Sequence, residues 1–416
     1  MPLVRDSLVA VSTVVAAPVV VAALACRSDW RVGLPERLGG LPRQTPGALW
    51  LHGASVGEAR LVARIAQARL RDGHRVIATV QTATARALLR AESPDLSTTL
   101  APVDHPWSVG RALDRVAPAA IVLFETEIWP CWISAAAERD IPIGILSGRI
   151  SDRSWPRYRR IAPLIRGALG RLSAIGARGP DDAARFLALG ADPARVRVTG
   201  DLKYAAASVA VEPPVELRRA LAGECVVGAA STHAGEEQAV LDACEICERS
   251  GLPVRLVLAP RHLARIDEVE QLVVASGRRC RRRSRLGDAG LAPGEVLLLD
   301  TLGELRGLHA LARIVFVGGS LVALGGHDPI EVVQQGCPVA IGPSHANVRE
   351  PVERLVAAGA AVVVADAEAL ARAVQAAVQG SGAEARRAAE GFVAEGREVF
   401  ERSLAWIDRL VGRDAR

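Results

Sequence analysis

Two glutamates stand where short apolar strands of the first half are predicted to end. Glu58 closes the tetrapeptide Ser55-Val-Gly-Glu58, which follows the predicted strand 48–53 and opens a helical stretch. Ser-x-x-Glu is a capping box, in which both side chains satisfy the first amides of a helix. Glu125 begins "ETEIWP", which places two carboxylates at the end of strand 119–125. A glutamate at such an edge could act as a general base; a helix cap and a solvated carboxylate pair are the alternative interpretations.

Lys203, in "GDLKYA", is the only lysine among the 51 Lys and Arg residues of the chain. A composition rich in Ala, Arg, Gly and Val is typical of a GC-rich genome, so a chance survivor is one interpretation. Lysine is also a compact point charge on a flexible stem, which fits where the planar fork of arginine does not. Asn347 is likewise the only asparagine.

In the second half, four consecutive predicted strands end in groups suited to an anionic ligand. Ser231 and Thr232, in "ASTHAGEE", precede a helix start, where small hydroxyls and free amides predict an anion site. Arg261, in "LAPRHLAR", suits a bidentate phosphate contact. The segment "DTLGELRGL" comes next, followed by "VGGSLVALGGHDPIE", whose four glycines let backbone amides approach a ligand. Glu331 in that last segment could accept two hydroxyls of a ribose.

Apolar β-branched runs alternate with helical stretches along the whole chain, which predicts βα units and parallel sheets in an α/β fold. The predicted strands are 48–53, 75–80, 119–125, 141–146, 172–177 and 195–200 in the first half, and 225–230, 254–259, 295–300, 313–319, 337–342 and 360–365 in the second. The Pro-containing stretch 207–217 predicts a linker. Two sandwiches joined in this way predict a cleft, with ligands at the carboxyl ends of the strands.

The bulk composition narrows the partners and excludes some site classes. A net charge of +5 and a pI near 9.0 favour anionic partners. The seven cysteines are scattered and odd in number, which argues for a reducing compartment, and the eight histidines lack tight ligand spacing, so we expect no metal site. Cys244 and Cys247 form a CxxC within a predicted helix, where buried thiols are the expected outcome. The segment "RRCRRRSR" (278–285) predicts a solvated basic loop, with a nucleic-acid or lipid surface as the alternative.

The N-terminus carries a candidate membrane anchor. Residues 7–26, "SLVAVSTVVAAPVVVAALAC", hold no charge and are about as long as the roughly 20-residue helix that crosses a bilayer. Arginines follow this stretch more densely than they precede it, so the positive-inside rule predicts that the rest of the chain stays cytoplasmic. A cleaved signal peptide and a lipoprotein signal ending at Cys26 are the alternatives.

With these residues in view, the chain resembles the 3-deoxy-D-manno-octulosonic acid (Kdo) transferase family. The resemblance runs in family order from about residue 30 to 355, through "LWLHGASVGE", "APVDHPW", "ETEIWP", "GRISDRS", "VTGDLKY", "STHAGEE", "APRH", "DTLGEL" and "FVGGSLVALGGHDPIE". It implies a GT-B fold of two Rossmann-like domains and metal-independent, inverting transfer of Kdo from CMP-Kdo to a lipid A precursor at the inner membrane. It implies no cofactor and no nucleic-acid partner. Another GT-B transferase or a catalytically silent lipid-surface protein are the alternatives.

The resemblance also implies roles for individual residues. Glu58 matches the catalytic base, and Glu125 and Lys203 match positions that stabilise the transition state. The segments that match the CMP contacts are Pro260 with Arg261, Leu302 with Gly303 and Glu304, and Asp328, Pro329, Ile330 and Glu331. Asp328 departs from the family, which usually has asparagine there.

These inferences divide the chain into an anchor, two domains, a linker and a returning helix. The boundaries are 1–27 for the anchor, 30–206 for the acceptor domain, 207–217 for the linker, 218–383 for the CMP-Kdo domain and 384–416 for a C-terminal helix that returns toward the first domain.

Overall fold

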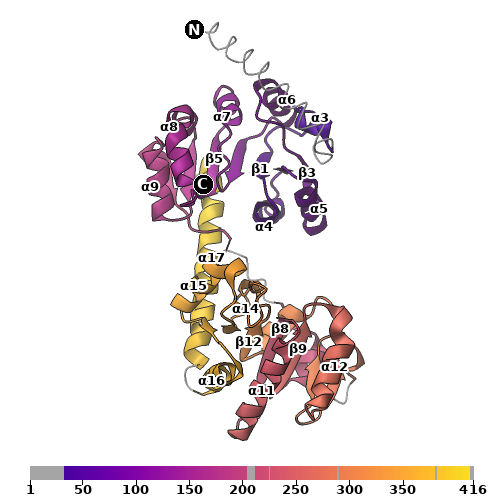
Figure 1. The fold of residues 1–416 in the computed structure, drawn as a ribbon. Coiled ribbons are helices and arrows are strands. Elements are labelled where there is room, and N and C mark those ends of the chain that lie inside the picture. Colours follow the sequence, from indigo (N-terminus) through magenta and orange to yellow (C-terminus); the bar gives the residue numbers. More distant parts are fainter. Residues whose placement is uncertain (1–31, 204–210, 224, 288–289, 380–381, 413–416) are drawn as a thin grey trace. The chain divides into compact units, whose positions relative to one another are not determined.

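The computed structural model describes residues 32–203, 211–223, 225–287, 290–379 and 382–412. The chain separates into two compact units, one of residues 1–206 with 398–416 and the other of residues 207–397 (Figure 1). Each unit is built on one seven-stranded sheet in which all pairs run parallel. The predicted α/β fold with two parallel sheets is therefore confirmed.

The first sheet has the strand order β3-β2-β1-β4-β5-β6-β7. Its strands are β1 Leu49–Gly53, β2 Val76–Val80, β3 Ser97–Leu100, β4 Ala120–Phe124, β5 Ile143–Gly148, β6 Ala174–Ala177 and β7 Val196–Val198. Its helices are α3 Leu34–Arg37, α4 Val56–Arg71, α5 Ala83–Glu92, α6 Pro106–Val116, α7 Pro130–Ala137, α8 Trp155–Leu169 and α9 Pro180–Ala188.

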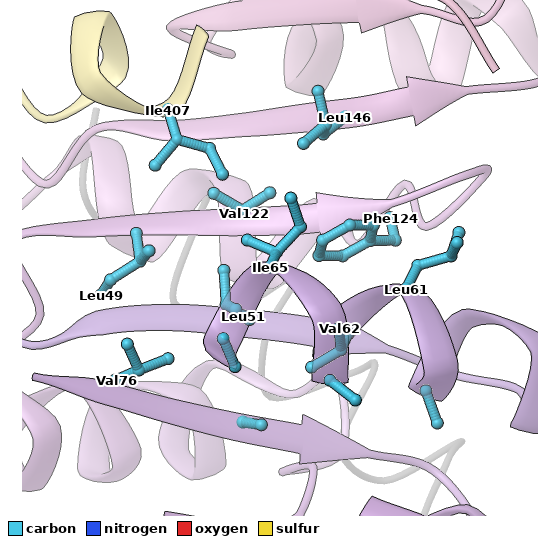
Figure 2. Close-up of a cluster of buried hydrophobic side chains, with 14 of the residues drawn as sticks. Leu49, Leu51, Leu61, Val62, Ile65, Val76, Val122, Phe124, Leu146 and Ile407 are labelled. Atoms are coloured by element: carbon cyan, nitrogen blue, oxygen red, sulfur yellow. The ribbon is translucent and has the colours of Figure 1, made fainter. Parts of the chain in front are cut away.

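Helices cover both faces of this sheet. Its central strands are therefore buried on both sides, and they carry nearly continuous apolar runs. On one face α4, α5 and the end of the last helix pack together, and on the other face α6 to α9 do so. Figure 2 shows the first of these cores, with Leu61, Val62 and Ile65 of α4 among side chains of β1, β2 and β4.

The second sheet has the strand order β10-β11-β9-β8-β12-β13-β14. Its strands are β8 Val226–Thr232, β9 Arg255–Pro260, β10 Cys280–Arg282, β11 Val296–Leu298, β12 Ile314–Val317, β13 Val339–Ile341 and β14 Ala361–Val363. Its helices are α10 Val215–Ala220, α11 Glu236–Arg249, α12 Ile266–Ala275, α13 Leu305–Leu311, α14 Ile330–Val333, α15 Arg349–Ala357 and α16 Ala367–Val378. Cys244 and Cys247 are free and buried in α11, and burial raises the pKa of the Cys244 thiol to about 12, as expected for packing rather than redox chemistry.

The last helix, α17 Gly382–Leu410, begins in the second unit and ends in the first. Its final turns place Val399, Phe400, Trp406 and Ile407 in the α4 face of the first core. Gly144 of β5 must lack a side chain, because a Cβ there would lie 2.5 Å from the Trp406 ring.

The structure differs from the sequence-based prediction in the linker and in two strands, and the predicted anchor lies outside the described residues. The linker predicted at 207–217 is shorter than expected, because α10 already begins at Val215. Strands β3 and β10 were not predicted; both are short edge strands that run beside one neighbour. The anchor predicted at residues 7–26 lies outside the described residues, and none of the helices within 32–412 that the structure describes is long and apolar enough to span a bilayer.

Candidate active site

The switch point of the first sheet lies between β1 and β4, because the chain order runs outward in opposite directions on either side of that pair. Ligands of open α/β sheets bind at the carboxyl ends of the strands at such a point. Glu58 lies in the first turn of α4, after β1, and Glu125 directly follows β4. The two carboxylates predicted to do chemistry therefore stand at the same edge of the sheet.

Glu58 is held by a local network of hydrogen bonds and is only 7% exposed. Ser55, the N-cap of α4, accepts a hydrogen bond from the Glu58 amide at 3.2 Å and donates its hydroxyl to Glu58 Oε1 at 2.8 Å. The Ala54 amide donates to Oε2 at 2.7 Å. Gly53 permits this packing, because a Cβ there would lie 2.9 Å from the Glu58 Cβ. The carboxylate is thus part of the helix cap and is fixed at the strand edge by the same contacts.

The environment of Glu58 shifts its protonation equilibrium. Burial raises the pKa of Glu58, the hydrogen bonds from Ser55 and Ala54 lower it, and the charge of Glu127 raises it; the net direction is upward. A base of this kind is more easily protonated than an exposed glutamate, so activity that needs the carboxylate is lost on acidification at a higher pH than usual.

Replacing Ser55 by alanine is expected to move the acidic limb of the pH profile of kcat/KM to higher pH. The variant loses a hydrogen bond that favours the charged form of Glu58, so the carboxylate protonates more readily. The loss of the cap should also cost about 1 kcal/mol of stability. Ser55→Thr, which keeps the hydroxyl, should retain the profile of the unaltered protein, and an identical profile for Ser55→Ala would contradict the assignment.

Glu125 stands on a strained backbone in a charged neighbourhood. Its φ of 57° lies in the left-handed region, where a residue other than glycine costs on the order of 1–2 kcal/mol. Burial and the charge of Glu58 raise the pKa of Glu125 to about 7, with Arg149 lowering it, Asp201 raising it and Lys203 lowering it. Glu125 therefore exchanges a proton near neutral pH.

Lys203 reaches this cluster from the end of β7. Asp201 accepts the Lys203 amide at 3.0 Å and stands 3.5 Å from Arg178 Nη1, which fixes the turn. The Leu202 amide donates to Ser147 Oγ at 3.3 Å, which attaches the turn to the end of β5. The charge of Lys203 acts on Glu125, so the structure brings the three predicted catalytic residues to one edge of the first unit.

A polar chain beside Glu58 was not predicted as part of the site. The fully buried His52 approaches Glu127 Oε2 with its Nε2 at 3.7 Å, and Trp129 Nε1 donates to the same oxygen at 2.6 Å. On its other side, His52 Nδ1 lies 3.0 Å from Thr79 Oγ1, which also accepts from Trp50 Nε1 at 2.9 Å. The signal available in the sequence was a histidine one residue before the end of a strand that is otherwise apolar.

In the second unit the switch point lies between β8 and β12, and a buried carboxylate accepts backbone amides there. The carboxylate of the fully buried Glu236 accepts the amides of His233 and Gly319 on Oε2, and those of Ser320 and Leu321 on Oε1, at 2.8–2.9 Å. Those four amides are therefore not free for a ligand, and the amide of His233 is the member of the predicted anion site that Glu236 already occupies. The physical reason is that a side chain of the first turn of α11 reaches the chain after β12, where it accepts the amides of Gly319, Ser320 and Leu321.

Pro260 and Arg261 end β9 at the same edge. Pro260 is buried, and the Arg261 amide donates to the carbonyl of Thr232 at 3.0 Å, which leaves the exposed guanidinium beyond the strand end. Arg261 lies near His327, on which its charge acts. The structure thus places Arg261 where the sequence predicted a phosphate contact.

The segment after β11 combines exposed and paired residues. Leu302 is 84% exposed and Gly303 has a φ of 87°, so the backbone turns sharply outward there. Glu304 is the N-cap residue of α13; it accepts from Thr301 and, at 2.7 Å, from Arg283. The carboxylate is therefore held by the protein itself.

The basic segment 278–285 was predicted as a solvated loop, and this is wrong. It contains β10 and a short 3-10 turn, and four of its six arginines are paired with carboxylates of the same unit. The pairs are Arg278 with Glu248, Arg281 with Glu295, Arg282 with Glu270 and Asp267, and Arg283 with Glu304 and Glu216. Internal pairing removes most of the positive field that a lipid or nucleic-acid surface would need.

The residues Asp328, Pro329, Ile330 and Glu331 form a tight turn into α14. Asp328 Oδ1 accepts the Ile330 amide at 3.0 Å. The Oδ1 of an asparagine would serve this bond equally well, so the departure from the family removes an amide donor and places a carboxyl group there. Glu331 is half-exposed, with Arg306 at 3.5 Å.

The structure explains why residue 347, the only asparagine of the sequence, is an asparagine. Its Nδ2 donates to the Leu324 carbonyl at 3.0 Å, and its amide donates to the Gly325 carbonyl at 2.9 Å. The side chain lies so close to Gly325 that a Cβ there would be 2.4 Å from Nδ2. Asn347 therefore braces the glycine turn that leads into Asp328. Among the residues placed in both units, no group of three or more His, Cys, Asp or Glu is arranged to hold a metal ion.

Two parallel α/β units, each with polar side chains gathered at its switch point, form a GT-B-like fold. The solved structure of UDP-GlcNAc 2-epimerase from Neisseria meningitidis shares the fold, at 12% identity and a TM-score of 0.55 over 88% of this chain and 100% of that one. Residues 32–206 match the family described as 3-Deoxy-D-manno-octulosonic-acid transferase (kdotransferase).

The relatives give the family. The 3-deoxy-D-manno-octulosonic acid transferase of Bordetella pertussis is 35% identical over 358 residues, which cover 82% of each chain. The solved C-terminal CMP-Kdo binding domain of WaaA from Acinetobacter baumannii is 30% identical, with a TM-score of 0.39 over 45% of this chain and 94% of that one. The chain belongs to the Kdo transferase family, and it is a glycosyltransferase.

Proposed function

We propose that this enzyme transfers Kdo from CMP-Kdo to a hydroxyl of a lipid A precursor, with inversion and without a metal ion. The first unit carries the base and takes the acceptor, and the second unit binds the donor. The observation that carries the proposal is the Glu58 carboxylate, hydrogen-bonded by Ser55 and Ala54 beside Glu125 and Lys203, in a chain of this family.

In the proposed reaction one proton is transferred, one bond to the anomeric carbon forms and one bond to that carbon breaks. Glu58 takes the proton of the acceptor hydroxyl, and the oxygen attacks the anomeric carbon of Kdo from the face opposite the leaving group. The bond between that carbon and the phosphate oxygen breaks, and CMP departs with the electron pair. Without a metal, cationic side chains such as Arg261 have to balance the charge on the departing phosphate.

Lys203 gives a separate prediction. We expect Lys203→Arg to lower turnover on the order of 100-fold without loss of folding, because a compact ammonium fits beside Glu125 and the acidic sugar where a planar guanidinium does not. Steady-state CMP release and a thermal melt measure the two effects. Turnover like that of the unaltered protein would mean that the lysine is an accident of composition.

The function is tested by CMP release from CMP-Kdo by the detergent-solubilised full chain. We expect release only when a tetraacylated, bisphosphorylated disaccharide lipid is present, with product mass increased by whole Kdo units. Release with another nucleotide sugar in place of CMP-Kdo would favour a different transferase. Binding to lipid without release from any nucleotide sugar would favour a lipid-surface protein.

For localisation we propose the inner membrane, with the catalytic units facing the cytoplasm. The support is the uncharged stretch 7–26 followed by arginines. Alkaline extraction of membranes from cells that express the full chain should leave the protein in the pellet. Quantitative release into the supernatant would contradict an integral anchor.

A further inference from the structure

Three histidines meet at the switch point of the second unit. His233 follows β8, His262 follows β9, and His327 lies in the glycine-rich segment after β12. His233 and His327 are joined by their Nε2 atoms at 2.8 Å, with ring planes within 10° of each other. The His262 ring stands edge-on to His233, with centroids 5.7 Å apart.

The distance between the two nitrogens fixes how many protons the pair can hold. At 2.8 Å one Nε2 must carry a proton and the other must accept it. The pair can therefore be neutral, or it can be an imidazolium hydrogen-bonded to an imidazole with one positive charge. In the charged form both Nδ1 atoms carry protons, so the pair presents two donors. Within the part of the chain that the structure describes, neither Nδ1 atom has a hydrogen-bond partner.

The surroundings of His327 disfavour its protonation. Burial lowers the pKa of His327, the neighbouring His233, Arg261 and His262 lower it further, and only Glu236 acts in the other direction. Glu236 is already committed, because its two oxygens accept four backbone amides. An added proton on the pair would therefore lack a free countercharge in the protein alone.

The other charged groups near the pair are engaged elsewhere. Asp328, the next residue after His327, bonds the Ile330 amide. His345, which lies against Gly326, has its Nδ1 2.8 Å from the Gly342 carbonyl. Glu237 is paired with Arg265 at 2.7 Å.

We propose that the His233–His327 pair takes up one proton when the phosphate of the donor nucleotide binds at this edge, and that the resulting monocation holds the phosphate together with Arg261. The inference rests on the proposed function for the identity of the ligand. It goes further by assigning the phosphate contact to a histidine pair and by coupling binding to a proton. The amides bonded to Glu236 cannot bind an anion, and the two Nδ1–H donors of the charged pair provide that contact instead.

The coupling has a definite sign. A group whose pKa rises on binding strengthens the complex at low pH, and the gain is lost as the pH rises through the pKa of the complex. CMP should therefore bind more tightly as the pH falls, by up to about tenfold per pH unit in the window between the pKa of His327 in the free protein, which burial lowers, and its pKa in the complex.

The test is calorimetric titration of the full chain with CMP at several pH values and in buffers of different ionisation enthalpy. The unaltered protein should take up close to one proton more per CMP than His327→Gln does. The CMP affinity of His327→Gln should also change less with pH. The comparison between the two proteins cancels the titration of the CMP phosphate itself. Cytidine, which lacks the phosphate, should show no uptake, and free Kdo tests the sugar carboxylate as the alternative anion.

Labelled-histidine NMR provides a second readout, with His233→Gln and His327→Gln used to assign the signals. Saturating CMP should shift the ring nitrogens of both residues toward imidazolium values while His345 stays unchanged. Equal proton uptake in the unaltered protein and in His327→Gln, with CMP bound to both, would overturn this inference alone. Absence of CMP binding to the unaltered protein would overturn the proposed function with it, and proton uptake driven by Kdo rather than CMP would overturn the assignment to the phosphate.

Discussion

Glu58→Gln is expected to lower turnover by about 10²–10⁴-fold while leaving the protein folded, because an amide cannot take the acceptor proton. Glutamine keeps the shape of the side chain. Its Oε1 can still accept the Ala54 amide, and the Ser55 hydroxyl still accepts the amide of residue 58, so the helix cap remains. Single-turnover CMP release measures the chemical step, and circular dichroism with a thermal melt reports folding.

A matched control is Glu92→Gln at the end of α5. Glu92 is exposed and stands 4.0 Å from Arg60, away from the switch point, so its loss should leave CMP release unchanged. CMP release at the unaltered rate in Glu58→Gln would remove Glu58 from the role of base, and would leave the buried carboxylate as a helix cap only.

Glu236→Ala is expected to lower the free energy of unfolding of the second unit by about 3–5 kcal/mol. The melting temperature should fall by an amount on the order of 10 °C. The substitution leaves the amides of His233, Gly319, Ser320 and Leu321 without their acceptor at a buried site. The last three lead into the glycine-rich segment, so CMP affinity should fall as well. Hydrogen exchange of those amides should accelerate before the rest of the unit unfolds.

Glu245→Ala on the same helix is the comparison for this loss. Glu245 is exposed and pairs with Arg249 across 3.7 Å on the surface of α11, so its removal should change stability by less than about 0.5 kcal/mol. Unchanged exchange at residues 319–321 in Glu236→Ala would show that water satisfies the amides and that the carboxylate does not hold the segment.

The strands that sequence analysis located are those whose own residues carry the signal. Runs such as Ala120–Phe124 are apolar throughout because helices cover both faces of the sheet, and a run of this kind is visible without a partner. The strands β3 Ser97–Leu100 and β10 Cys280–Arg282 carry hydroxyl or arginine side chains and were missed. They form because a neighbouring strand offers unpaired backbone groups, which a local pattern does not report.

The residues of the site likewise divide into those with a local sequence signal and those whose contacts depend on neighbouring strands. The capping pattern at Ser55 and Glu58 predicted a helix start and a candidate base from four residues, because the contacts involved are local. That Glu125 has a left-handed backbone, that Lys203 acts on it from the turn after β7, and that His52 meets Glu127 depended on which strand ends become neighbours.

By itself the sequence determined the alternation of strands and helices, the positions of most strand ends and the family, because these follow from residue types and spacings within short segments. Only the tertiary structure decided that Glu236 accepts the amides of residues 319–321, that four arginines of 278–285 are paired, and that the Nε2 atoms of His233 and His327 lie 2.8 Å apart. The physical reason is that hydrogen bonds and ion pairs between distant segments depend on distances of a few ångströms, and those distances are set by the order of strands in the sheet rather than by order along the chain.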